Sequence, residues 1–273
     1  MNPTAEPQQQ MVYELEQAEM LGLMAAVQTS LIVGIDNAQL VPNGQKAQQE
    51  MALQGLQQLR DKGWLTPSTD EDGLELLDAN LGMMMPALAY PEMMLLVTRD
   101  APGQPQQQFR YYRANPVQLA LEMPAPNQYR LVGILDAVAM LNAARSHLPV
   151  TEEPTTAVDS FSLPLDAFMA AKDLAEQGNV TDAAAQFEAA GCSATGATTL
   201  AQAINQPTVG GTMAFLQFED QQIVNGRNLV MVRNETAAWM VQPREDNPEL
   251  LAVQTATPES YSAVLLANAR AVS

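Results

Sequence analysis

The same order of helices and strands is predicted twice along the chain, and this repetition limits the folds that the chain can adopt. The stretch LQQLRDKGWLTP (residues 56–67) ends a helix at Gly63, and AAKDLAEQGNVT (residues 170–181) ends another at Gly178. Further along each half, a strand, a tight turn, a strand, a Pro-rich turn, a strand and a helix ending in Ala-Arg follow one another. The pattern predicts an α+β fold with a pseudo-twofold duplicated unit and a central antiparallel β-sheet flanked by helical bundles.

The repeat also predicts the domain organisation. Residues 1–10 are rich in Pro and Gln, so we expect them to be disordered. Residues 11–150 form the N-terminal α+β half and residues 151–273 the C-terminal α+β half. Because edge strands of two such halves can pair, we expect one composite domain.

Hydrophobic periodicity and turn residues place the individual elements. Residues 31–35 (LIVGI) read either as a strand or as the end of the first helix. The expected helices are 11–28, 45–62, 74–89, 135–146, 165–177, 182–190, 198–205 and 258–271. The expected strands are 93–99, 109–114, 117–123, 129–134, 212–220, 228–233, 236–242 and 250–255.

The charge balance narrows the possible partners. The chain has 31 Asp and Glu against 13 Lys and Arg, a formal net charge of -18. Phosphate backbones and anionic lipid surfaces repel such a chain, so we expect no nucleic-acid binding and no membrane insertion. We expect neither a signal peptide nor a transmembrane helix, and a cytoplasmic location is the default.

Few residues could carry chemistry. The single histidine, His147, ends a helix, where its charged form would gain from the helix dipole. The single cysteine, Cys192, has acidic neighbours that do not favour a thiolate, and residues 69–73 (TDEDG) form an incomplete calcium loop. We therefore expect no catalytic residues, no metal site and no cofactor, and a protein that is not an enzyme.

The order of motifs resembles the EspG family, the cytosolic chaperones of type VII (ESX) secretion systems. The residues that carry the resemblance are LQQLRDKGWLTP followed by an acidic turn, then YPEMMLLVTR. FSLPLDAFMAAKDLAEQGNVTDAAAQFEAAGCS adds a second helical segment ahead of the strands. The resemblance implies a chaperone or adaptor that keeps a helical secreted protein, PE/PPE- or WXG100-like, soluble for export.

The resemblance also implies where the partner binds. In the family the partner docks against the central sheet and the C-terminal helical bundle. Carried over to this chain, these are the predicted strands 212–220, 228–233 and 236–242 and the helices within residues 165–190. The partner-binding residues predicted there are Met213, Phe215, Met231, Trp239, Phe168 and Phe187.

Two questions stay open at this level. The strand MAFLQF (residues 213–218) is apolar on both faces, so helices could cover both sides of the sheet or leave one side for a partner. A winged-helix-like regulator or another protein-interaction scaffold is the alternative function, because a helix, a turn, a helix and strands occur in that order. An unrecognised enzyme would need polar groups gathered around His147 or the carboxylates.

Overall fold

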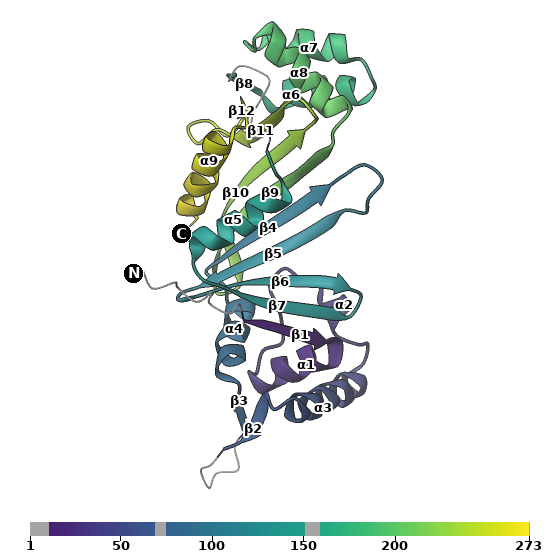
Figure 1. Ribbon diagram of the computed structural model, residues 1–273, viewed down its shortest axis with the longest axis vertical. Coiled ribbons are helices and arrows are strands. Elements are labelled where there is room, and N and C mark those ends of the chain that lie inside the picture. Colours follow the sequence, from purple (N-terminus) through teal and green to yellow (C-terminus); the bar gives the residue numbers. More distant parts are fainter. Residues whose placement is uncertain (1–10, 69–74, 151–158, 273) are drawn as a thin grey trace, which may run out of the picture. The chain divides into compact units, whose positions relative to one another are not determined.

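A computed structural model describes residues 11–68, 75–150 and 159–272 (Figure 1). The predicted disordered segment 1–10 and the acidic turn 69–73 lie outside the described residues. Within the described ranges the chain has nine helices and twelve strands, which confirms the α+β class. Ten strands form one sheet in the order β1-β7-β6-β5-β4-β9-β10-β11-β12-β8, and β2 pairs with β3.

The elements have the following bounds. The helices are α1 Gln17–Ala26, α2 Asn37–Leu40, α3 Gln45–Asp61, α4 Ala79–Ala89, α5 Ala137–His147, α6 Leu165–Glu176, α7 Val180–Ala189, α8 Ala194–Asn205 and α9 Pro258–Ala271. The strands are β1 Val12–Glu16, β2 Leu65–Pro67, β3 Glu75–Leu77, β4 Met93–Asp100, β5 Gln107–Ala114, β6 Val117–Ala125, β7 Gln128–Ile134, β8 Ser160–Pro164, β9 Val209–Glu219, β10 Gln222–Arg233, β11 Ala238–Pro243 and β12 Leu250–Thr255.

Contacts divide the chain into two compact units, which we describe separately. Unit 1 comprises residues 1–94, 109–140 and 217–225; unit 2 comprises residues 95–108, 141–216 and 226–273. Along the chain, the order of one strand, three helices, four strands and one helix occurs twice if the β2–β3 hairpin and α4 count as an insertion. This order supports the predicted duplication and the halves 11–150 and 151–273, which both remain predictions.

In unit 1 the chain begins with a strand where we predicted a helix. β1 pairs antiparallel with β7, with Val12 opposite Val132 and Leu15 opposite Tyr129. α1 follows without a turn, because Glu16 and Glu19 form a reciprocal capping box at the boundary. The helix prediction for 11–28 was wrong at its start because five strand residues run directly into an apolar helix and no Gly or Pro separates them.

Two glycines let α1 and α3 approach closely. A Cβ on Gly55 would lie 1.7 Å from the carbonyl oxygen of Ala18, and a Cβ on Gly22 would lie 2.6 Å from the backbone of Gly55. No side chain fits at either position, so the helices touch through their backbones. This contact holds the mostly polar α3 against the apolar α1.

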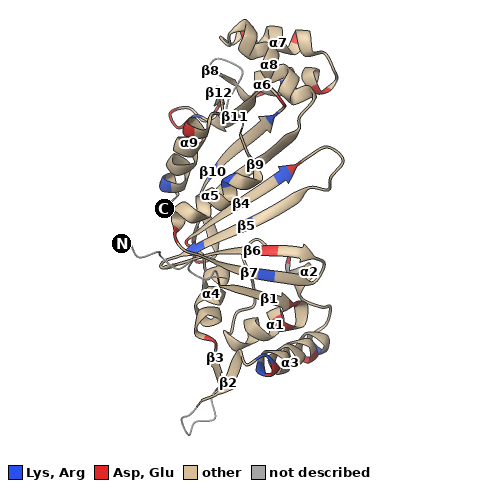
Figure 2. Ribbon diagram, in the orientation of Figure 1, with Lys and Arg blue, Asp and Glu red and all other residues tan. Residues whose placement is uncertain are grey.

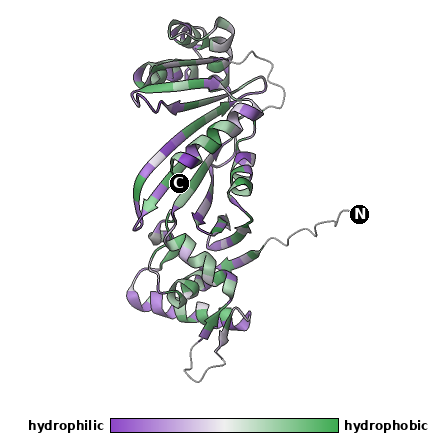
Figure 3. Cartoon of the chain, turned by 90° about the vertical axis from the view of Figure 1, so that its left-hand side faces the viewer, coloured by the Kyte–Doolittle hydropathy of each residue, from purple (hydrophilic) through white to green (hydrophobic). Residues whose placement is uncertain are grey.

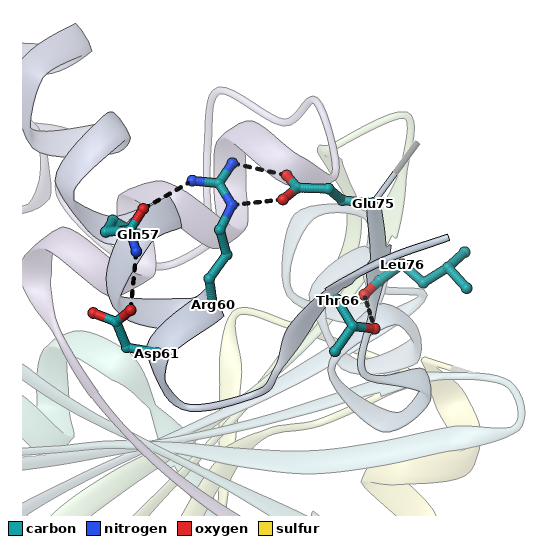
Figure 4. Close-up of polar contacts among 6 residues, drawn as sticks. All are labelled: Gln57, Arg60, Asp61, Thr66, Glu75 and Leu76. Carbon is teal, nitrogen blue, oxygen red and sulfur yellow. Dashed lines mark hydrogen bonds and ion pairs between the residues drawn. The ribbon is translucent and has the colours of Figure 1, made fainter. Parts of the chain in front are cut away.

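An ion pair connects the end of α3 to the β2–β3 hairpin. Arg60 donates from Nε to Oε1 of Glu75 at 2.5 Å and from a terminal nitrogen to Oε2 at 2.8 Å (Figure 4). The hydrogen bond from Arg60 lowers the pKa of Glu75. The predicted helix 74–89 begins later, at Ala79, because residues 75–77 pair with 65–67 and Asp78 caps α4.

In unit 2 four strands pair antiparallel in the order β10-β11-β12-β8. Val230 lies opposite Val241, Val241 opposite Val253, and Val253 opposite Phe161. The turn between β9 and β10, which belongs to unit 1, consists of Asp220 and Gln221, both with positive φ, as a two-residue hairpin turn requires. β8 was not predicted, because its five residues end at Pro164 just where α6 begins.

The other predicted helices occur, most of them with shifted ends. The predicted helix 258–271 matches α9, with Thr257 as N-cap and Pro258 in the first turn. α8 begins at Ala194, earlier than predicted, because Ser193 caps it. Residues 31–35 form neither a strand nor the end of α1. Figure 3 shows hydrophilic and hydrophobic residues interleaved along the strands and helices, the pattern of amphipathic elements.

The α1–α3 contact generates a stability prediction. Gly55→Ala places a methyl group on the carbonyl of Ala18, so the helices must separate, and we expect a loss of about 3 kcal/mol in the free energy of unfolding. Urea titration followed by circular dichroism measures the loss. Gly82→Ala is the matched control, because its Cβ meets nothing within 4 Å in helix α4, and we expect it to stabilise by about 0.5–1 kcal/mol. Equal effects of the two substitutions would contradict the packing assignment.

Candidate partner-binding surface

Alternation along the strands of unit 2 gives its sheet one strongly apolar face. Trp239, Val241, Val253 and Phe161 lie on it by their paired registers. All four are buried, and Trp239 is 0% exposed. The surrounding residues of α6, α7 and α8 form one hydrophobic cluster with them.

The three helices cover this face through aromatic side chains. The rings of Phe168 on α6 and Phe187 on α7 lie 6.0 Å apart, and Phe187 lies 6.2 Å from Phe161 on β8. Small residues, among them Ala171 and Ala175 on α6, let the helices come close to one another. Gly178 and Gly191 adopt positive φ after α6 and α7, which turns the chain sharply between the short helices.

The opposite face of the same strands is also covered. Met231 and Met240 are paired on it and are 3% and 1% exposed. On that face Asn268 of α9 donates to the side-chain oxygen of Gln242 at 3.0 Å. Helices of the chain therefore cover both faces at β11. At β11 this excludes an uncovered apolar face beside Trp239.

The six predicted partner-binding residues are all buried in the chain. Trp239, Phe168 and Phe187 come together in the cluster under the three helices. Met213 and Phe215 are 0% exposed, and the sulfur of Met213 accepts a hydrogen bond from Tyr261 at 3.6 Å. Their positions give them a packing role. Contact of these side chains with a partner remains a prediction and would require the helices to move.

Exposed apolar residues lie on the same elements. Leu165 and Met169 on α6 are 52% and 42% exposed, and Val230 on β10 is 40% exposed. Leu165 and Met169 are four residues apart, so they share one side of α6, while Phe168, Ala171 and Ala175 are buried. The helical period separates the two sets, but the predicted residues were taken from the elements that the resemblance assigns to the partner, without regard to the face on which they lie.

The outer surface of α6 and α7 is acidic. Lys172 is the one basic residue among these helices, and it forms an ion pair with Glu176 at 2.6 Å. Figure 2 shows the acidic positions on these helices. They are Asp166, Asp173, Glu176, Asp182 and Glu188. A partner that covers the exposed residues of α6 therefore meets apolar groups beside negative charge.

Asp159 connects the start of β8 to the start of α8. Its carboxylate accepts hydrogen bonds from the hydroxyl of Ser193 at 2.5 Å and the amide of Ser193 at 3.0 Å. Burial raises the pKa of Asp159, but the two Ser193 bonds and the Cys192 thiol outweigh this effect, so the pKa is lowered overall. Burial, followed by the charge of Asp159, raises the pKa of the Cys192 thiol to about 12, so the thiol is protonated and a poor nucleophile at neutral pH.

The burial and the charge of His147 differ from what the sequence predicted. It is half-buried, and burial together with the nearby charge of Arg99 lowers its pKa to about 4. The imidazole is therefore neutral at pH 7, and the expected gain from the helix dipole is absent. Among the described residues, no group of His, Cys, Asp or Glu has the arrangement of a metal site. No helix in those ranges is long and apolar enough to cross a membrane.

These features together define an EspG-like fold: an α+β chain with a ten-stranded antiparallel sheet and a compact bundle of short helices. A solved structure with this fold is that of the Mycobacterium tuberculosis type VII secretion system chaperone EspG5 in complex with the PE25-PPE41 dimer. The match has a TM-score of 0.65 over 96% of this chain and 95% of that chain, at 14% sequence identity. No family profile and no characterised relative matches the sequence.

The aromatic cluster leads to a second prediction. Phe187→Ala removes a ring that contacts both Phe161 and Phe168, and we expect a loss of about 3–5 kcal/mol in the free energy of unfolding. Met169→Ala, on the exposed side of α6, should cost less than about 1 kcal/mol. Urea unfolding monitored by Trp fluorescence measures both. If Phe187→Ala cost no more than Met169→Ala, the packing role would be wrong.

The carboxylate of Asp159 leads to a prediction about pH. Because its folded pKa is lowered, the stability that its charge contributes is present above the unfolded pKa of about 4 and is lost as the pH falls through the folded pKa. Asp159→Asn removes that charge, so we expect the variant to be less stable than the wild type at pH 7 and the difference to narrow in acid. Unfolding titrations between neutral and acid pH measure it. A difference that is constant with pH would show that the charge has no role.

Proposed function

We propose that this protein is a non-enzymatic chaperone of type VII secretion that binds a helical secreted protein of the PE–PPE kind and keeps it soluble. The observation that carries the proposal is the EspG-like fold over nearly the whole chain. The EspG5 chaperone with that fold is in complex with a PE25-PPE41 dimer. A comparable role for this chain rests on that likeness and on its exposed apolar residues.

A binding role also agrees with the chemistry of the described residues. The thiol of Cys192 is protonated at neutral pH, and the imidazole of His147 is neutral but half-buried beside Arg99. A protonated thiol is a poor nucleophile, so Cys192 does not suit nucleophilic catalysis. What unit 2 does present is Leu165, Met169 and Val230 on rigid elements, a feature of surfaces that bind other proteins.

The proposed function is tested by whether the chain forms a complex with a PE–PPE pair. The chain is co-expressed with PE–PPE pairs from the genome that encodes it, and size-exclusion chromatography with light scattering determines the mass of the complex. We expect a stable assembly with one copy of the chain, and a partner that aggregates when expressed alone. The proposal would fail if every pair were soluble alone and none formed a complex with the chain.

The exposed side of α6 gives the matching substitution test. The double change Leu165→Ser and Met169→Ser removes two exposed apolar side chains, and we expect the partner to bind about tenfold more weakly. Isothermal titration calorimetry with the purified partner measures the affinity.

The control for this test is Ala185→Ser, at an exposed position of α7. It should leave the affinity unchanged, and the melting temperature of each variant shows whether it is folded. Unchanged binding by the double variant would assign the contact to another surface, without deciding whether the chain is a chaperone.

A further inference from the structure

Four exposed carboxylates on α6 and α7 have no Lys or Arg beside them. All 13 Lys and Arg of the chain lie in the described residues, and none comes within 4.0 Å of these four groups. The four are Asp166, Asp173, Asp182 and Glu188. The fifth carboxylate of these helices, Glu176, pairs with Lys172. Because α8 carries no charged residue, the unpaired charge is confined to two of the three helices.

Two of these carboxylates lie where the helix dipole disfavours them. Asp173 is in the last turn of α6 and Glu188 is in the last turn of α7, and neither last turn contains a basic residue. The C-terminal end of a helix carries a partial negative charge, so a carboxylate there lowers the stability of the helix. Proteins break such a local rule mainly at functional sites. This placement therefore points to a role in binding.

The carboxylates of α6 lie on the same side of the helix as its exposed apolar residues. Leu165, Met169 and Asp173 are spaced by four residues each, so they follow one another along the outside of α6. At about 100° per residue, Asp166 lies within about 100° of this row around the helix axis. Phe168 is buried on the other side. The outer side of α6 thus presents two apolar side chains bordered by unpaired negative charge.

We propose that the outer side of α6 binds a surface of the secreted partner on which Lys or Arg side chains flank apolar residues. The inference rests on the proposed chaperone function and adds the charge of the partner's contact surface. A cation of the partner beside Met169 would neutralise Asp173 and offset the unfavourable charge at the end of α6. An acidic surface would be repelled by Asp166 and Asp173, so the same residues reject the wrong partner.

Two substitutions at one position test the charge. Asp173→Asn removes it and Asp173→Lys reverses it, and we expect the PE–PPE partner to bind about threefold and about tenfold more weakly. Both changes should raise the melting temperature by about 1–3 °C, because the negative end of α6 loses a carboxylate. Isothermal titration calorimetry at about 50 mM and about 500 mM salt measures the affinity, and the losses should shrink at the higher salt. A purely structural role for Asp173 would not combine higher stability with weaker binding.

Asp61 is the matched control, because it is an exposed carboxylate in the last turn of α3 in unit 1. Asp61→Asn and Asp61→Lys change the net charge by the same amounts and should leave the affinity unchanged. Equal losses at Asp61 and Asp173 would show that only the overall charge of -18 acts and would overturn the inference. Unchanged or tighter binding by Asp173→Lys would also overturn it.

A second probe separates this inference from the proposed function. Two dye-labelled peptides of about 20 residues carry leucines on one helical face and either lysines or glutamates on the other. By fluorescence anisotropy we expect the full chain to bind the lysine peptide alone, and Asp173→Lys but not Asp61→Lys to weaken it.

The two probes together give a decision in every case. If the lysine peptide binds as expected but no PE–PPE pair does, the proposed function fails and this inference stands. If a PE–PPE pair binds equally well to the wild type and to Asp173→Lys, this inference alone fails. If neither the pair nor the peptide binds, both fail.

Discussion

The packing of the short helices against the sheet around Trp239 decides the structure of unit 2. These side chains belong to one buried cluster, which joins four strands to α6, α7 and α8. The helices are ten to twelve residues long, and helices of this length are marginal in isolation. Their order therefore comes from burial against the sheet, and the outer side of α6 is held in place by the aromatic residues beneath it.

Sequence periodicity was sufficient where a pattern is long or has a clear end. α9 was predicted with its cap because Thr257 and Pro258 mark its start, and most strands of the two meanders were found because turns separate them. β1 and β8 were missed because each has five residues and passes directly into a helix. Their strand pairing comes from partners far away in the sequence, which local propensity does not report.

Prediction of the partner-binding residues from the sequence was limited for a different reason. Trp239, Phe187 and Met213 were predicted because they lie on the strands and helices where the resemblance to the EspG family places the partner. Large apolar residues in such elements also form a core, and all three are buried here. Burial by helices on both sides of β11 depends on tertiary packing. The helical period does separate Phe168 from Leu165 and Met169 on α6, so the exposed set was accessible from sequence once the strand face was known. The helix dipole was expected to stabilise the charged form of His147. Only the structure shows that burial lowers the pKa of this side chain.

Charge is distributed unevenly over the helices of unit 2. α6 and α7 carry five carboxylates and one lysine, which is already paired, whereas α8 carries no charged residue. A partner that covered Leu165 and Met169 on α6 would need apolar groups flanked by basic groups. Like-charge contacts are costly, so the surrounding carboxylates would reject acidic partners. Because the apolar area on α6 is small, such polar discrimination would contribute more to specificity than to affinity.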